Sequence, residues 1–224
     1  MIAVLTHPRP GASYLAATLA STDASASAEG RRVVVSDSLA PVGDLPKGWT
    51  LEAFERPPTA TPDNRWTLWR AASLACEAGE DLIAVEDDVR WCRNGARCAE
   101  ILQVPHDVAW VSLFDIGSTW EMPHGLWVSR RPEGFIYAQA IKFPLRTCGL
   151  LRHMGCATFD RPGSDNQLAI LGDMLGLSYA IMVPSLVQHV GAVSAVGNGG
   201  LEGRVSRSWR EDHDPATAGG RAFV

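Results

Sequence analysis

The sequence lacks any run of about 18 apolar residues, the length that a membrane-spanning helix needs. The apolar stretch from Met1 to Leu5 is too short for the hydrophobic region of a signal peptide, and no basic segment precedes it. These two absences predict a protein without a membrane span that resides in the cytoplasm.

Cysteine pairs at metal-binding spacing are also absent. No C-x-x-C motif occurs, and the closest pair, Cys92 and Cys98, does not have the spacing of a zinc knuckle. The count is odd, which argues against a framework of disulfides. We therefore expect reduced and mostly buried thiols at Cys76, Cys92, Cys98, Cys148 and Cys156.

Excess positive charge is missing, since the net charge is −5 over 224 residues. A mildly acidic chain lacks the overall basic field of a dedicated nucleic-acid binder, although local basic patches remain compatible with it. A hydrophobic content of 46% provides enough apolar surface for one α/β domain. The eight tryptophans fit a ligand-binding enzyme but also fit an ordinary core.

The apolar pattern predicts alternating strands and helices. Ile2 to Leu5 and Arg32 to Val35 are expected as buried strands with a helix between them, which is a βαβ opening and implies a parallel sheet. We expect further strands at 81–85, 108–114, 134–143 and 179–183, an irregular stretch at 40–63, a helix from Asp63 or Asn64 to Gly79, and a helix capped by Ser164 and Asp165 that runs to Leu175.

Three carboxylates, Glu86, Asp87 and Asp88, directly follow the predicted strand at 81–85. Ligands of open α/β sheets bind at the carboxyl ends of the strands. Adjacent carboxylates repel one another unless a cation lies among them, and no lysine near the triplet neutralises it. Strand geometry would place Glu86 and Asp88 on one side and Asp87 on the other. Hard oxygen ligands suit Mg²⁺ or Mn²⁺, so the triplet predicts a metal site, with a solvated acidic turn as the alternative.

A second motif is the segment Pro184-Ser185-Leu186-Val187-Gln188-His189-Val190-Gly191. Neutral imidazole is an acceptable ligand for Mn²⁺, whereas a histidine in a satisfied core position is the ordinary alternative. Together with Glu86-Asp87-Asp88-Val89, this segment resembles GT-A glycosyltransferases with a D-x-D-type metal motif, including the N-acetylglucosaminyltransferase type IV-like group.

The resemblance, which extends over residues 1–198, implies a single GT-A (Rossmann-like) domain with a mostly parallel central sheet flanked by helices. It implies a metal-dependent and inverting transfer of a sugar from a nucleotide-sugar donor, expected to be a UDP-sugar, to an acceptor hydroxyl. Asp88 and His189 would bind Mn²⁺ or Mg²⁺, and Glu86 and Asp87 would bind the nucleotide sugar. The domain is expected over residues 1–210 and a disordered tail over 211–224.

The same resemblance implies roles for residues at the strand ends. Thr6 and Arg9 would meet the base or phosphate, and Asp37 the base or ribose, with plain solvation in a loop as the alternative for Arg9 and Asp37. Further donor-binding residues implied by the resemblance are Tyr137 and Gln139 at the sugar, and Gly191 and Ser194 at the diphosphate.

An inverting transferase needs a general base on the acceptor hydroxyl. Asp165 is the first candidate and Asp160 and Glu121 are weaker ones, while capping of a helix is the alternative role for Asp165. Asp115 would line the sugar pocket. Trp120 and Trp127 would stack on an acceptor or pack in the core.

The acceptor stays open among a saccharide, a small molecule and a hydroxymethylated base of phage DNA. The high content of Ala, Arg and Gly favours a bacterial or phage protein, and Arg204, Arg207 and Arg210 would form one basic helical face for DNA or an ordinary solvated face. Two other functions remain: a metal-dependent nucleotidyltransferase, disfavoured by the single glycine between Thr6 and Gly11, and a non-catalytic nucleotide-binding protein.

Overall fold

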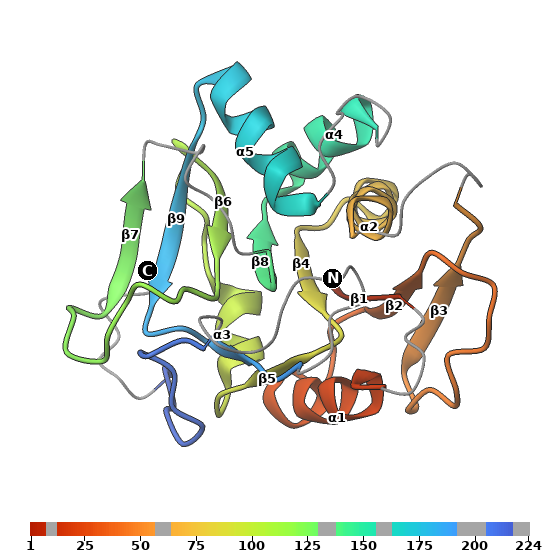
Figure 1. Cartoon of the computed structure of the whole chain (residues 1–224), viewed down its shortest axis with the longest axis horizontal. Coiled ribbons are helices and arrows are strands. Elements are labelled where there is room, and N and C mark those ends of the chain that lie inside the picture. Colours follow the sequence, from red (N-terminus) through yellow and green to blue (C-terminus); the bar gives the residue numbers. More distant parts are fainter. Residues whose placement is uncertain (8–12, 57–63, 130–137, 156–162, 192–204, 217–224) are drawn as a thin grey trace.

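The central sheet has eight strands and carries helices on both faces (Figure 1). The computed structural model describes residues 1–7, 13–56, 64–129, 138–155, 163–191 and 205–216. The strands of the sheet are β1 Ile2–Thr6, β2 Arg32–Ser36, β3 Trp49–Ala53, β4 Leu82–Glu86, β6 Val108–Ser112, β7 Gly125–Ser129, β8 Ala140–Phe143 and β9 Ser178–Val183. Two short strands, β5 Val89–Trp91 and β10 Val187–His189, form a separate antiparallel pair.

Five helices accompany the strands: α1 Leu15–Ser25, α2 Arg65–Ala78, α3 Gly95–Ile101, α4 Leu145–Met154 and α5 Ser164–Leu175. In Figure 1, α2, α4 and α5 lie above the sheet, and α1 and α3 lie below it. Alternate residues of the buried strands supply the two cores, because successive side chains of a strand point to opposite faces. Ile2 and Val4 belong to the core with α1 and α3, whereas Ala3 and Leu5 belong to the core with α2, α4 and α5.

The strand order is β3-β2-β1-β4-β8-β6-β9-β7. Strands β3, β2, β1 and β4 are parallel, β8 is antiparallel to both of its neighbours, β6 and β9 are parallel, and β7 is antiparallel to β9. The predicted α/β class with a mostly parallel sheet is therefore confirmed. The order reverses at β1, which pairs with β2 on one side and with β4 on the other, and ligands of such sheets bind at this kind of switch point.

Several sequence expectations need correction. The stretch at 40–63, expected to be irregular, contains the edge strand β3. Its Leu51 is exposed, so the strand lacks the buried apolar run from which the other strands were predicted. Asn64 precedes α2 but makes no side-chain cap, and neither Ser164 nor Asp165 caps α5, because that helix already begins at Ser164 after Gly163. Gly79, in the left-handed conformation with φ 69°, ends α2 where the sequence predicts.

The segment at 205–216 contradicts two expectations. Residues 205–210 are not helical, so Arg207 and Arg210 share no helical face, and Arg204 lies outside the described residues. Thr119 and Arg207 instead form an isolated β-bridge. Residues 211–216, expected in a disordered tail, contact the domain: the backbone N–H of Arg93 donates to the carbonyl of Glu211. This segment is held by hydrogen bonds between residues that are far apart in the sequence, which local patterns do not predict.

Among the helices that the structure describes, none is both long enough and apolar enough to cross a membrane.

Candidate functional site

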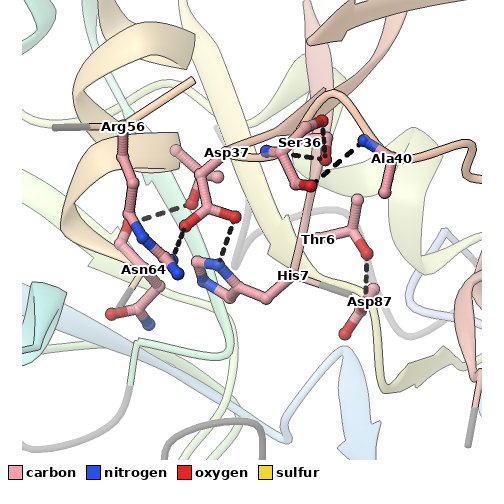
Figure 2. Close-up of polar contacts among 10 residues, drawn as sticks. Thr6, His7, Ser36, Asp37, Ala40, Arg56, Asn64 and Asp87 are labelled. Carbon is pink, nitrogen blue, oxygen red and sulfur yellow. Dashed lines mark hydrogen bonds and ion pairs between the residues drawn. The ribbon is translucent and has the colours of Figure 1, made fainter. Parts of the chain in front are cut away.

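The acidic triplet lies at the switch point of the sheet. Glu86 is the last residue of β4, beside β1, and Asp87 and Asp88 form the turn that leads into β5. Thr6, the last residue of β1, donates its hydroxyl hydrogen to Oδ2 of Asp87 (Figure 2). Thr6 and Asp87 are both buried, so this bond connects the carboxyl ends of the two central strands.

Asp88 and His189 meet across the antiparallel pair of β5 and β10. Nε2 of His189 lies 3.3 Å from Oδ2 of Asp88, and both side chains are buried. The N–H of Val190 donates to the carbonyl of Asp88 at 2.8 Å, which fixes the backbone on the same side. Asp88 and His189, 101 positions apart in the chain, therefore present a carboxylate oxygen and an imidazole nitrogen to one point.

Gly191 contacts the same carboxylate. A Cβ added at Gly191 would lie 2.3 Å from Oδ2 and 2.8 Å from Cβ of Asp88. Such distances are too short for any side chain, so the close approach of this backbone to Asp88 requires glycine. Gly191 therefore lies directly beside Asp88, and its expected place at the diphosphate stays a prediction.

Glu86 faces a different set of groups. Its Oε1 accepts a hydrogen bond from Nδ2 of Asn64, and Oδ1 of Asn64 accepts the backbone N–H of Ser164 at 2.8 Å. Burial, then the charges of Asp88 and, more weakly, of Asp87 and Asp165 raise the pKa of Glu86 to about 8, against the lowering effect of the Asn64 bond. The shift favours the protonated form of Glu86 near neutral pH in the metal-free protein.

A row of hydroxyl groups on α1 holds the acidic turn. Thr18 donates to the carbonyls of Asp87 and Val89 at 2.7 Å and 3.0 Å. Farther along the same face, the hydroxyls of Ser21 and Thr22 accept from the backbone N–H and the indole N–H of Trp91. Positions 18, 21 and 22 share one helix face at spacings of three and four, so α1 satisfies the backbone that follows β4.

Asp37 follows β2 and forms a second buried polar group beside the triplet. Oδ1 of Asp37 lies 2.9 Å from Nδ1 of His7, and Oδ2 pairs with the guanidinium of Arg56 (Figure 2). Burial, the largest influence, raises the pKa of Asp37, but the contacts with His7 and then Arg56 outweigh it and the net pKa is lowered. Asp37 is therefore ionised at neutral pH. It is also buried, so the alternative of a solvated loop residue is wrong for Asp37.

Other predicted residues lie around this group or outside the described part. Gln139 is buried and directly precedes β8. Its backbone carbonyl accepts the backbone N–H of Glu86 at 2.8 Å, so Gln139 lies beside the triplet. Asp165, in the first turn of α5, acts on Glu86 through its charge and accepts from the N–H of Asn166. The predicted residues outside the described ranges are Arg9, Tyr137, Asp160 and Ser194.

Asp115, predicted for the sugar pocket, and Trp120 and Glu121, predicted for the acceptor side, lie in the segment between β6 and β7. Asp115 accepts the backbone N–H of Ser118, so its carboxylate closes a local turn. The guanidinium carbon of Arg210 lies 4.5 Å from the ring centroid of Trp120, and that ring also contacts His124 and His213. Glu121 is fully exposed. Trp127 on β7 is 43% exposed and is therefore not the core residue that the alternative predicted.

Asp88 and His189 are the two side chains of this region that could bind a divalent cation. In the described ranges, no group of three or more His, Cys, Asp and Glu side chains is arranged to hold a metal ion. Asp88 and His189 nevertheless converge to 3.3 Å and provide one oxygen and one nitrogen. Divalent ions at phosphate-transfer sites commonly take one or two protein ligands and complete their shell with water and substrate phosphate. The two side chains fit such a partial site.

Sequence reasoning missed four residues of this region: His7, Thr18, Arg56 and Asn64. His7 and Asn64 stand next to predicted strand or helix ends, which is a weak signal shared with many solvated loop residues. Thr18 and Arg56 carry no local signal, since their partners are 19 or more positions away.

No protein-family model and no curated protein matches the chain.

Proposed function

We propose that the protein is a metal-dependent glycosyltransferase of the GT-A type, which transfers a sugar from a nucleotide diphosphate sugar to an acceptor hydroxyl. The observation that carries the proposal is the convergence of Asp88 and His189 at the switch point of the sheet, 3.3 Å apart and buried. The sequence resemblance assigns metal binding to these same two residues, so local motif and tertiary contact agree.

The three acidic residues would have different roles in binding the nucleotide-sugar donor. Asp88 and His189 would hold Mn²⁺ or Mg²⁺, which neutralises charge on the leaving diphosphate when bound. Asp87 is fixed by Thr6 and is oriented before any ligand arrives. Glu86, which Asn64 holds through a hydrogen bond to Oε1, would contact the nucleotide sugar beside Asp87.

Asp165 is the proposed general base. It stands in the first turn of α5, next to Ser164, whose backbone N–H bonds to Asn64, and Asn64 in turn bonds to Glu86. A carboxylate there can accept the proton of an acceptor hydroxyl while the sugar departs from the diphosphate. The acceptor class, whether a saccharide, a small molecule or a modified DNA base, belongs to the same proposal and is open among these three.

Calorimetric titration with UDP tests the donor site. We expect binding in the presence of Mn²⁺, and loss of binding with EDTA and in Asp88→Ala and His189→Ala. The exposed Asp173 and His106 provide matched controls, Asp173→Ala and His106→Ala, which should bind as the wild type does. UDP at 100 times its Kd should also stabilise the fold by about 2.7 kcal/mol.

Binding that is indifferent to metal and to both site substitutions would refute the metal site. Turnover is then measured with a set of sugar nucleotides and with saccharide, small-molecule and hydroxymethylated-DNA acceptors. Turnover with any pair identifies a transferase, and its absence with all pairs identifies a nucleotide-binding protein that does not catalyse transfer.

A further inference from the structure

The two proposed metal ligands are held in different ways. Asp88 directly precedes β5, and α1 holds the backbone of β5 through the hydroxyls of Thr18 and Ser21. His189 ends β10, a strand of three residues that pairs only with β5 in the part of the chain that the structure describes. A two-stranded ribbon is marginally stable on its own. The position of His189 therefore depends on what contacts β10 from outside this pair.

The imidazole of His189 lacks the second contact that usually orients a metal ligand. Metal-binding histidines almost always use their other ring nitrogen in a hydrogen bond to a carboxylate, a carbonyl or water, which fixes the ring. Nε2 of His189 faces Asp88, and Nδ1 is buried without a hydrogen-bond partner among the described residues. Within the described ranges, the backbone of β10 is therefore what orients this ring.

The C-terminal segment, residues 205–211, holds β10 through Gln188, which directly precedes His189. Oε1 of Gln188 accepts the backbone N–H of Ser206 at 2.9 Å, and Nε2 donates to the carbonyl of Ser206 at 3.1 Å. Successive side chains of a strand point to opposite faces, so Gln188 and His189 face opposite sides of the pair. Gln188 thus supplies β10 with two hydrogen bonds to a third segment of the chain.

The same segment contacts β5 and the turn before β10. Arg90 lies directly opposite Gln188 in the register of the pair and forms an ion pair with Glu211. In the turn, the backbone N–H of Ser185 donates to the hydroxyl oxygen of Ser208 at 3.0 Å, and both serines are fully buried. Both members of the ion pair are more than half exposed, and such pairs contribute little. The hydrogen bonds of Gln188 and Ser208 are therefore the main connections.

We propose that the C-terminal segment is a clamp that positions His189 for metal binding, with Gln188 as the positioning residue. This inference rests on the proposed function, because it takes His189 to be a ligand of Mn²⁺. Gln188 acts on the metal only through the strand that carries His189. Removal of contacts that orient a metal ligand typically lowers metal affinity by about 10–100-fold.

Titration of the full chain with Mn²⁺ in the presence of UDP tests the clamp. Gln188→Met keeps the length of the side chain without its hydrogen bonds, and should weaken the affinity for Mn²⁺ about tenfold or more. A large excess of Mn²⁺ should restore UDP binding, because the ligands are displaced and not removed. Ser208→Ala, which loosens the same segment at a second point, should behave alike. Gln103→Met, at an exposed glutamine, is the matched control and should keep the wild-type affinity.

Thermal unfolding of each variant separates positioning from loss of the fold, and Ser208→Ala decides the test if Gln188→Met does not fold. Loss of UDP binding that accompanies lost thermal stability, and that excess Mn²⁺ does not restore, would show a purely structural role and overturn the inference. Unchanged Mn²⁺ affinity in both clamp variants, with its loss in Asp88→Ala and His189→Ala, also overturns the inference while the proposed function stands. If the wild type shows no Mn²⁺-dependent binding of UDP or GDP, the proposed function fails and the inference with it.

Discussion

At the scale of single residues, the site depends on side chains that constrain one another at short range. Gly191 must lack a side chain because Asp88 occupies the space, and the buried Asp37 has His7 against one oxygen and Arg56 against the other. The family resemblance implied Gly191 and Asp37 as site residues. It did not predict their partners, since nothing local to Asp37 points to Arg56.

Gly191→Ala should displace Asp88 and abolish metal-dependent UDP binding, because the new methyl group would lie 2.3 Å from Oδ2. Gly149→Ala is the control, since a Cβ on that glycine in α4 meets nothing within 4 Å, and alanine should stabilise the helix by about 1 kcal/mol. Calorimetry and thermal unfolding report the two effects. Unchanged UDP binding in Gly191→Ala would show that the position of Asp88 is irrelevant to the donor.

Asp37 should make stability depend on pH in acid. Its pKa is lowered from 3.8 on folding, so its contribution is fully present above the unfolded value and is lost as pH falls through the folded value. We expect Asp37→Asn to be about 1–3 kcal/mol less stable than the wild type near neutral pH, with a difference that shrinks below about pH 4.

Urea unfolding at several pH values measures this difference, with Asp173→Asn as the exposed control. A difference that stays constant into strong acid would contradict the assigned direction of the shift.

At the scale of elements, α1 is unusual in using hydroxyls where an amphipathic helix would place apolar side chains. Thr18 and Thr22 are fully buried and bond to the backbone or indole of the segment after β4. The sequence predicted this helix from Leu15, Thr18 and Leu19 at helical spacing, but not that its polar face is a contact surface. Serine and threonine serve equally well on solvated faces, so only the packing of α1 against β5 distinguishes the two.

Thr18→Val should cost about 1–3 kcal/mol, because two buried carbonyls, of Asp87 and Val89, lose their donor while the shape is kept. Thr18→Ser keeps the hydroxyl and should lose less. Chemical unfolding measures both, and UDP affinity reports whether the acidic turn has moved. Equal stability of the valine and serine variants would mean that the hydroxyl contributes nothing.

At the scale of the whole molecule, the sheet brings distant segments to one edge. The carboxyl ends of β1, β2 and β4 place Thr6, Asp37 and Glu86 together, and the pair of β5 and β10 brings His189 to Asp88. The C-terminal segment is held by buried serines: the backbone N–H of Ser185 donates to Ser208, and the hydroxyl of Ser206 donates to that of Ser185. Short polar residues carry no pattern that predicts such docking.

The sequence by itself determined the buried strands, their parallel core and the position of the acidic triplet, because apolar runs and a strand end are local properties of the chain. The meeting of His189 with Asp88, the pairing of Asp37 with His7 and Arg56, and the bridge of Asn64 to Glu86 were decided by tertiary structure alone. These contacts join residues between 19 and about a hundred positions apart. Burial of polar groups costs free energy unless they are paired, and these partners meet only once the sheet has formed.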